Sequence, residues 1–474
     1  MTQPTFGMIG LGTMGENLAL NLDDHGTPVA VWNLESEWTD KFVAAHPQVT
    51  GTRALQELVK ALPRPRRIMM MIKAGAPVDM TLDKLEPLLE PGDVVIDGGN
   101  SWFKDTQRRE AAWRPLDLHF VGMGVSGGSE GARRGPSMMP GGSKQAWEAL
   151  APALKAIAAQ TKQGACVTYV GPDGAGHFVK MVHNGIEYGD MQLIAEIYDV
   201  LRRAFGYEAG RIADIFDKWN GGILESFLVE LSAKVLRVPD SKDPKGGALV
   251  DHVLDVAGQK GTGKWSAQVA LDLAVPIPTI NAAIDARLLS ALKAERVAAS
   301  KQLAGPASST GGVDEKILAL MPPALYAAKL CSYAQGMALI AAGSHEWKWD
   351  IDLKEMARIW TGGCIIRARL LEDIMRAFER DGKLANLLLD ADVRKSVAEG
   401  QAALRQVLAL AQARGIPTPA LSASLAYYDA YRTADLPQNL TQAQRDAFGA
   451  HTYQRSDAPD GKPIHTDWLG DDKA

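Results

Sequence analysis

Short apolar runs alternate with helix-like segments over the first third of the chain. Each run is apolar throughout and is ended by Gly or polar residues, which is typical of strands covered on both faces. We expect strands at Phe6–Ile9, Val29–Trp32, Ile68–Ile72, Val94–Ile96, Leu118–Val121 and Thr168–Val170. Helical segments between them, such as Glu16–Leu22, predict crossovers and therefore a Rossmann-like, doubly wound α/β domain over residues 1–176.

The hydrophobic spacing becomes helical from His177 onward, and strand-like runs become scarce. Ala-rich segments at Ile284–Lys301 and Ala324–Ala342 predict buried or half-buried helices. We expect the loops between such helices at Pro239–Gly247 and Gly305–Gly312. This pattern predicts a large all-α domain over residues 177–436. Residues 437–474 are polar and lack a hydrophobic core of their own. We therefore expect an extended C-terminal tail that packs on another surface instead of folding by itself.

Composition narrows the class of protein without identifying it. The 474 residues are 46% hydrophobic and 23% charged, with a formal net charge of −5, so neither disorder nor nucleic-acid binding is indicated. The three cysteines, Cys166, Cys331 and Cys364, fit neither a disulfide framework nor a zinc site. With no leader pattern, no apolar stretch approaching ~20 residues and no metal-ligand cluster, we expect a cytoplasmic protein without a membrane or metal requirement.

A nucleotide-binding turn is predicted directly after the first strand. Residues 10–15 read Gly-Leu-Gly-Thr-Met-Gly, a G-x-G-x-x-G pattern between a strand and a helix. Cofactor selectivity is normally set at the end of the second strand, where Asn33-Leu34-Glu35 carries an acid and no Arg or Lys. We therefore favour NAD over NADP. The alternative is that the acids only solvate a loop while a distant cation such as Arg53 reaches the 2′-phosphate.

A stripe of polar residues on an otherwise apolar helix is the strongest chemical signal. Lys180, His183, Asn184 and Glu187 stand at offsets 0, 3, 4 and 7, so they share one helix face. A buried Lys loses its charge more readily and can act as a general base, and a buried Glu can act as the matching acid. The alternative is an exposed edge with a widely spaced Lys–Glu pair.

Two Gly-rich segments are candidate anion sites. Ser126, Gly127 and Gly128 follow one predicted strand and Asn100 follows another, at the sheet edge where parallel folds bind ligands. A plain loop remains the alternative for the first segment. Lys260 and Thr262 lie in a second Gly-rich turn that lacks phosphate-loop spacing but suits a substrate phosphate.

Nearly the whole chain resembles the decarboxylating 6-phosphogluconate dehydrogenases of the pentose phosphate pathway. The resemblance is carried by several motifs in the right order, and these matching segments are Gly10–Gly15, Asp97–Ser101, Gly124–Gly142 (GVSGGSEGARRGPSMMPGG), Gly174–Gln192, Gly258–Trp265 and Gln442–Tyr453 (QAQRDAFGAHTY). It implies oxidation of 6-phosphogluconate at carbon 3, loss of carbon 1 as carbon dioxide, and formation of ribulose 5-phosphate. It also implies that no metal is needed and that the enzyme is a homodimer whose tails reach into the partner's site.

The resemblance assigns roles residue by residue. Lys180 is the expected base and Glu187 the expected acid. The substrate carboxylate and hydroxyls fall to Asn100, Ser126, Gly127, Gly128, His183 and Asn184, and the phosphate to Tyr188, Lys260, Thr262, Arg287 and Arg445. His451 lies in the tail with Arg445 and is a further expected substrate-binding residue. The cofactor contacts fall to Gly10, Leu11, Gly12, Thr13, Met14, Gly15, Asn33, Leu34, Glu35, Ile72, Lys73, Ala74 and Asn100.

The chain departs from the family pattern at two places. Members that use NADP generally have Arg followed by Ser or Thr where this chain has Leu34 and Glu35, which supports the preference for NAD. Arg134 stands where Tyr is usual. Two other functions remain possible on the sequence alone: a non-decarboxylating β-hydroxyacid dehydrogenase, which is shorter and would not be expected to carry the tail motif, and a catalytically silent nucleotide sensor.

Overall fold

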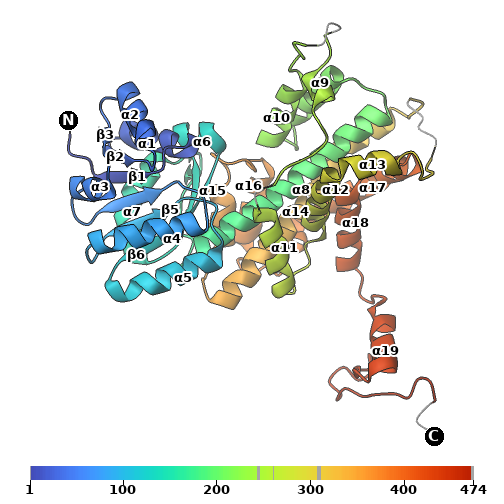
Figure 1. Cartoon of the computed structure of the whole chain (residues 1–474). Coiled ribbons are helices and arrows are strands. Elements are labelled where there is room, and N and C mark those ends of the chain that lie inside the picture. The colour runs from blue at the N-terminus through green and yellow to red at the C-terminus, as the bar shows by residue number, and fades with distance from the viewer. Residues whose placement is uncertain (1, 243–245, 260, 307–310, 471–474) are drawn as a thin grey trace. The chain divides into compact units, whose positions relative to one another are not determined.

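The computed structural model describes residues 2–242, 246–259, 261–306 and 311–470 (Figure 1). The chain divides into two compact units, residues 1–425 and 426–474, and the boundary falls inside helix α18 (Pro419–Tyr431). The first unit contains a sheet domain followed by helices, and the second contains one further helix.

The sheet has seven strands in the order β3-β2-β1-β4-β5-β6-β7. The first six strands are parallel and β7 is antiparallel to β6, so the order changes direction between β1 and β4, as in a doubly wound fold. The strands are β1 (Phe6–Ile9), β2 (Val29–Trp32), β3 (Thr50–Gly51), β4 (Arg67–Met70), β5 (Val94–Asp97), β6 (His119–Ser126) and β7 (Ser137–Pro140). A separate hairpin pairs β8 (Gln160–Thr161) with β9 (Gly164–Ala165).

Both faces of the sheet are buried, as the continuous apolar runs predict. Phe6 and Met8 join one hydrophobic cluster, whereas Ile9 joins the other. Successive side chains of a strand point to opposite faces, so an all-apolar strand supplies both clusters. The helices of this part are α1 (Thr13–Asp24), α2 (Ser36–Ala45), α3 (Leu55–Ala61), α4 (Ala76–Leu85), α5 (Phe103–Trp113), α6 (Gly128–Arg134) and α7 (Lys144–Ile157).

The predicted strands differ from the observed ones in several places, and the strand expected at Ile68–Ile72 lies at Arg67–Met70. Thr168–Val170 is wrong as a strand, because the backbone pairs with neighbouring chain only through isolated bridges at Val167 and Gly171 and one hydrogen bond from Val170 N–H to the Pro140 carbonyl oxygen, which form no continuous ladder. The expected strand at Leu118–Val121 extends to Ser126, so Ser126 belongs to β6 rather than to a following loop. The short strand β3 and the antiparallel β7 are not predicted by the pattern.

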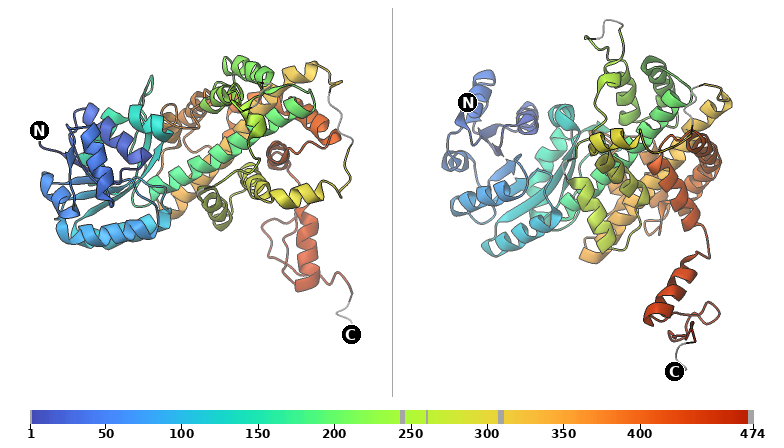
Figure 2. Two further views of the ribbon diagram at one scale, coloured as in Figure 1. Left: turned by 45° about the horizontal axis from the view of Figure 1, so that its top comes forward. Right: turned by 45° about the vertical axis from the view of Figure 1, so that its right-hand side comes forward.

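The helical part begins with α8 (Ala175–Arg203), which packs against β6, β7, α11, α12 and α14 (Figure 2). The helices that follow are α9 (Ala209–Asn220), α10 (Phe227–Leu236), α11 (Thr262–Asp272), α12 (Pro278–Ala291), α13 (Lys293–Ala299), α14 (Lys316–Trp347), α15 (Leu353–Ile359), α16 (Leu370–Arg380) and α17 (Ala391–Ala413). The predicted helix at Ile284–Lys301 is divided between α12 and α13, because the helix is interrupted at Leu292. The loops expected at Pro239–Gly247 and Gly305–Gly312 lie partly outside the described residues.

One helix in the described part of the chain, α14, is long and apolar enough to span a bilayer by length and composition. The expectation that no stretch approaches this length is therefore wrong. Because 67% of its most apolar window is buried inside the protein, and because it packs against α8 and α17, α14 reads as a core helix.

The second unit is built on α19 (Gln438–Gly449). An antiparallel bridge joins Tyr453 to Ile464, and the rings of Tyr453 and Trp468 lie 5.5 Å apart. The carboxyl group of Asp446 is buried among these segments.

Candidate active site

The predicted polar stripe lies on α8, and most of it is buried. Lys180 is 6% exposed, His183 is fully buried, and Asn184 and Glu187 are half-buried. Their apolar neighbours Phe178, Val179, Met181, Val182 and Ile186 are buried as well. The exposed-edge alternative is therefore excluded for this stripe.

Burial shifts the two ionisable ends of the stripe in opposite directions. Desolvation lowers the pKa of Lys180, against the attraction of Glu187 and Cys364. Desolvation raises the pKa of Glu187, while the positive charges of Lys180 and Arg287 lower it in part. Desolvation and the nearby Lys180 also hold the pKa of His183 well below its usual value. Each shift favours the neutral form, which a general base and a general acid need.

Hydrogen bonds connect the stripe to two other elements. The Nε2 atom of His183 lies 3.3 Å from Ser126 Oγ at the end of β6. His183 Nδ1 also lies 3.1 Å from Asn184 Oδ1, and the Asn184 amide donates to Thr262 Oγ1 at 3.2 Å. The structure therefore brings together four of the predicted substrate residues, from β6, α8 and α11.

Glycines allow close contact at the base of this cluster. A Cβ atom on Gly124 would lie 2.4 Å from Lys180 Cβ, so only Gly lets β6 approach the helix here. Gly127 has φ +118° and Gly128 has φ +62°, a region that favours Gly. Gly128 is exposed and begins α6, so the Ser126–Gly128 turn opens beside the stripe.

The predicted phosphate residues are only partly assembled. The guanidinium carbon of Arg287 lies 3.5 Å from the ring centre of Tyr188, and Tyr188 is the residue that follows Glu187. Arg287 also donates to the carbonyl oxygen of Gly258 at 3.2 Å, which ties α12 to the Gly-rich turn before Thr262. Lys260 lies outside the described residues.

Two further predictions concern residues away from this cluster. Asn100 is exposed in the turn after β5, which Asp97 holds by accepting from Gly99 N–H at 3.0 Å and Ser101 Oγ at 2.6 Å. Arg445 and His451 are exposed in the second unit, which is described by itself.

A pocket of about 730 Å³ lies at the ends of β1, β2 and β4. Gly10 has φ +93°, and a Cβ there would lie 2.6 Å from the Met71 carbonyl oxygen, so the turn needs Gly. Of the predicted cofactor residues, those that line the pocket are Gly10, Gly12, Asn33, Leu34, Glu35, Ile72 and Lys73. Leu11, Thr13, Met14, Gly15, Ala74 and Asn100 are not part of its wall. A Gly-rich turn beside a pocket of this size fits a dinucleotide.

Asn33 organises the selectivity end of this pocket. Its side-chain oxygen accepts from Leu11 N–H at 2.9 Å, and its amide donates to Glu35 Oε2 at 2.8 Å. Glu35 is therefore held at the pocket wall. Arg53 is paired with Asp40 at 3.1 Å and does not line the pocket, whereas Lys73 and Lys84 do.

The sequence pattern misses a segment that closes the substrate cluster from the helical part. The indole of Trp360 meets the His183 ring edge-on at 5.4 Å. A Cβ on Gly127 would lie 2.6 Å from the carbonyl oxygen of Gly363, and the buried thiol of Cys364 follows Gly363 in the chain. The Gly362-Gly363 pair within a helical region is the only sequence signal for it.

Two other findings complete the site. In the described part of the chain, no group of three or more His, Cys, Asp or Glu side chains lies close enough to hold a metal ion. Arg134 is exposed near Glu130, with 3.6 Å between Nε and Oε1, and nothing in the structure explains its presence.

Comparison with known proteins gives matches over the full chain. Residues 5–171 match the NAD binding domain of 6-phosphogluconate dehydrogenase, and residues 176–468 match the 6-phosphogluconate dehydrogenase C-terminal domain. The chain is 53% identical to a decarboxylating 6-phosphogluconate dehydrogenase of Synechocystis, over 99% of this chain and 98% of that one. It is 50% identical to an NADP(+)-dependent, decarboxylating relative of Bacillus subtilis, over 99% of this chain and 100% of that one.

A solved structure is similar over the same length. The 6-phosphogluconate dehydrogenase of Plasmodium falciparum, described in its apo form and in complex with NADP+ and with 6-phosphogluconate, matches with a TM-score of 0.94. That protein is 41% identical, and the match covers 98% of this chain and 100% of that one. The non-decarboxylating alternative therefore lacks support.

Proposed function

Because the chain belongs to the family of decarboxylating 6-phosphogluconate dehydrogenases, we propose that Lys180 and Glu187 carry out its reaction as base and acid. The reaction converts 6-phosphogluconate to ribulose 5-phosphate and carbon dioxide. The observation that carries the assignment is one buried amine and one buried carboxyl group on a single face of α8, with pKa values shifted toward each other.

The proton steps follow from these two side chains. Neutral Lys180 takes the proton of the carbon 3 hydroxyl, and a nicotinamide cofactor, when bound, accepts the hydride. Carbon 1 then leaves as carbon dioxide, and the electrons of the broken bond form an enediol as Lys180 returns its proton to the keto oxygen. Glu187 protonates carbon 2, which becomes carbon 1 of the product, while Lys180 regains the hydroxyl proton. One proton transfer from ammonium to carboxylate restores the starting state.

The other members of the cluster would bind and orient the substrate. Ser126, Gly127, Gly128 and Asn100 lie at strand ends and suit the carboxylate, and His183 and Asn184 suit the hydroxyl groups. Tyr188, Thr262, Arg287 and Lys260 suit the phosphate. The Arg287–Tyr188 stack at 3.5 Å supports this role, because it holds a cation beside the stripe.

Substitution of the base tests the assignment. Lys180→Met should lower kcat by about 10³-fold or more, because base catalysis is lost, while Glu187→Gln should lower it by about 10²-fold or more. The rates of cofactor reduction and carbon dioxide release are measured together. Lys218→Met, at an exposed position on α9, serves as the matched control. If kcat of the Lys180→Met enzyme stays within tenfold of wild type, a change of at most about 1.4 kcal/mol in activation free energy, the proposal is contradicted.

We propose NAD as the preferred cofactor of the two that the family uses. Glu35 is fixed at the pocket wall by Asn33, where its charge would oppose a 2′-phosphate. Glu35→Gln should therefore raise kcat/KM for NADP by about tenfold and change that for NAD less. Glu37→Gln, at an exposed acid that does not line the pocket, is the control. A wild-type preference for NADP would contradict this proposal. Lys73 and Lys84, which also line the pocket, would then be the expected partners of the 2′-phosphate.

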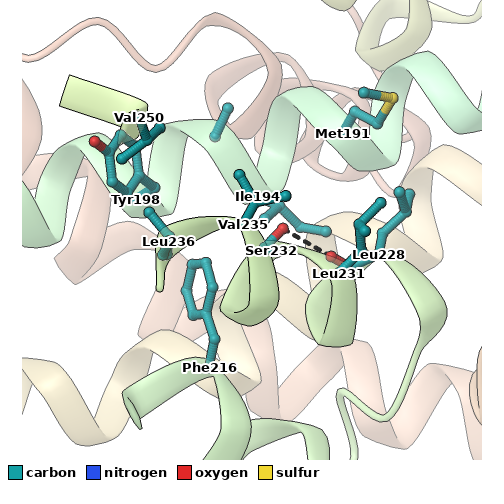
Figure 3. A pocket seen from close by; sticks show the side chains of 11 residues that line it. Met191, Ile194, Tyr198, Phe216, Leu228, Leu231, Ser232, Val235, Leu236 and Val250 are labelled. Carbon is teal, nitrogen blue, oxygen red and sulfur yellow. Dashed lines mark hydrogen bonds between the residues drawn. The ribbon is translucent and has the colours of Figure 1, made fainter. Parts of the chain in front are cut away.

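We also propose a homodimer with exchanged tails, active in the cytoplasm. An apolar pocket between α8, α9 and α10 has partly exposed Leu231 and Val235 at its rim (Figure 3), which supports a subunit contact on this face. Arg445 and His451 would serve the partner's phosphate site. The three buried free cysteines suit a reducing compartment.

Subunit mixing tests tail exchange. Lys180→Met and Arg445→Ala subunits are each defective, but a mixed dimer contains one site with wild-type Lys180 and a wild-type partner tail. Random reassociation should therefore restore about a quarter of wild-type activity. No recovery in a mixture that sedimentation shows to be hybrid would place the tail in its own subunit's site.

A further inference from the structure

Asp446 is the most heavily bonded side chain of the second unit. Its carboxylate accepts from the backbone N–H of Thr452 at 2.8 Å and of Thr466 at 3.0 Å. It also accepts from the indole of Trp468 at 2.8 Å and contacts His465 Nδ1 at 2.9 Å. Burial alone would raise the pKa of Asp446, but these hydrogen bonds lower it to about 2, so the carboxylate is charged at neutral pH.

The segment that Asp446 holds has an unfavourable backbone. Ala450 has φ +47° and Thr452 has φ +58°, which L-residues rarely adopt, least of all a β-branched one. Such conformations persist only where the surrounding structure fixes them, and they gather at functional sites. Here the N–H of Ala450 donates to the Asp446 carbonyl oxygen at 2.9 Å, and the N–H of Thr452 donates to its carboxylate.

His451 lies between these two strained residues and is exposed. Its ring lies over Gly449, because a Cβ on Gly449 would be 2.8 Å from His451 Nε2. Arg445 and Gly449 are four residues apart on α19 and share a face, so Arg445 and His451 lie on the same side of the helix. Gln442 links Arg445 to the turn that carries His451, because Gln442 Oε1 accepts from Arg445 at 3.0 Å and its amide donates to the Thr452 carbonyl oxygen at 2.6 Å.

We infer that Asp446 is a positioning residue that fixes Arg445 and His451 as a preformed pair for the substrate phosphate. The inference rests on the proposed function, since it assumes that this pair binds phosphate. Asp446 itself is buried, so it acts by holding the turn at residues 450–452. A preformed pair loses less side-chain and backbone freedom on binding, so the affinity for the phosphate increases.

Steady-state kinetics of the full-length Asp446→Asn enzyme test this inference. The Asn side chain has one acceptor oxygen instead of two, so it can accept from Thr452 and His465 or from Thr466 and Trp468, but not from both pairs. The turn therefore loosens while the reacting groups on α8 are untouched. We expect KM for 6-phosphogluconate and the inhibition constant of inorganic phosphate to rise about tenfold, with kcat within about threefold of wild type. A general loss of structure would lower kcat and the apparent Tm together, and this outcome would overturn the inference.

Gly449→Ala provides a second, independent variant. The added methyl group displaces the His451 ring and leaves every hydrogen bond of Asp446 in place. It should reproduce the rise in KM without a change in stability. Gly461→Ala, whose added methyl group would meet the Ala458 carbonyl oxygen at 2.9 Å in the same unit, is the control for local crowding.

Failure of the inference can be distinguished from failure of the proposed function. If wild type does not oxidise 6-phosphogluconate, the proposed function fails. If wild type is active and Arg445→Ala or His451→Ala raises KM, but Asp446→Asn and Gly449→Ala do not, the function stands and the positioning role of Asp446 is refuted.

Discussion

Replacing Gly124 by Ala tests whether close packing on β6 positions the amine of Lys180, the proposed base. The new Cβ would lie 2.4 Å from Lys180 Cβ and 2.9 Å from Lys180 Cγ. Carbon atoms normally approach to about 3.5–4.0 Å, so Lys180 or the strand must move by about 1 Å. Overpacking of this kind costs about 1–3 kcal/mol of stability.

The displacement should affect turnover more than stability. A reacting group misplaced by about 1 Å can cost about 100-fold in rate, which equals about 2.7 kcal/mol of activation free energy. The assay is kcat at saturating 6-phosphogluconate and cofactor, followed by cofactor absorbance, together with the apparent Tm of the same preparation.

Two other glycines separate the causes. A Cβ on Gly51, on β3, would lie 2.7 Å from Val43 Cγ2, so Gly51→Ala carries a packing cost on another strand, away from Lys180. Gly210→Ala adds a methyl group in open space and should change neither property. If Gly124→Ala keeps wild-type kcat, or if Gly51→Ala loses as much kcat, the contact between Gly124 and Lys180 does not set the position of the proposed base.

Two further predictions concern buried charges. Burial raises the pKa of Glu196 from 4.5 to about 7, so the folded state binds its proton more tightly and loses about 3 kcal/mol of stability as pH rises between these values. Glu196→Gln should remove this slope, seen as the difference in apparent Tm between pH 5.5 and pH 8; an unchanged slope would refute it. Lys329 and Asp190 form a buried ion pair at 2.8 Å. Lys329→Met should lower the free energy of unfolding in urea by about 3–5 kcal/mol, because it leaves the buried charge of Asp190 without a partner. Adding Asp190→Leu should recover most of that loss. An equal loss in the double variant would show that the unpaired charge of Asp190 is not the cause.

Local patterning made much of the fold predictable. Continuous apolar runs mark β1, β2 and β5 because both faces of the sheet are covered, and the offsets of Lys180, His183, Asn184 and Glu187 mark one face of α8. The antiparallel β7 was missed, because Ser137–Pro140 is short, ends in Pro and pairs by geometry that no local pattern encodes.

Contacts between residues distant in sequence were also not predictable. The carbonyl oxygen of Gly363 lies against Gly127, and Ser137 Oγ donates to the carbonyl oxygen of Ile359 at 2.6 Å. These contacts depend on how the helical part docks on the sheet, and a single sequence carries little record of that. The role of Asp446 was hidden for a similar reason, since its partners lie up to 22 residues away.

The first turn of α8 meets the sheet through backbone atoms. A Cβ on Gly176 would lie 2.3 Å from the carbonyl oxygens of Gly122 and Met139, so no side chain fits between helix and sheet there. The position of α8 against the sheet is thus set here by contact between main-chain atoms, and repacking of the surrounding apolar side chains barely alters this contact. A side chain larger than hydrogen at position 176 would therefore move the whole first turn of α8 away from the sheet.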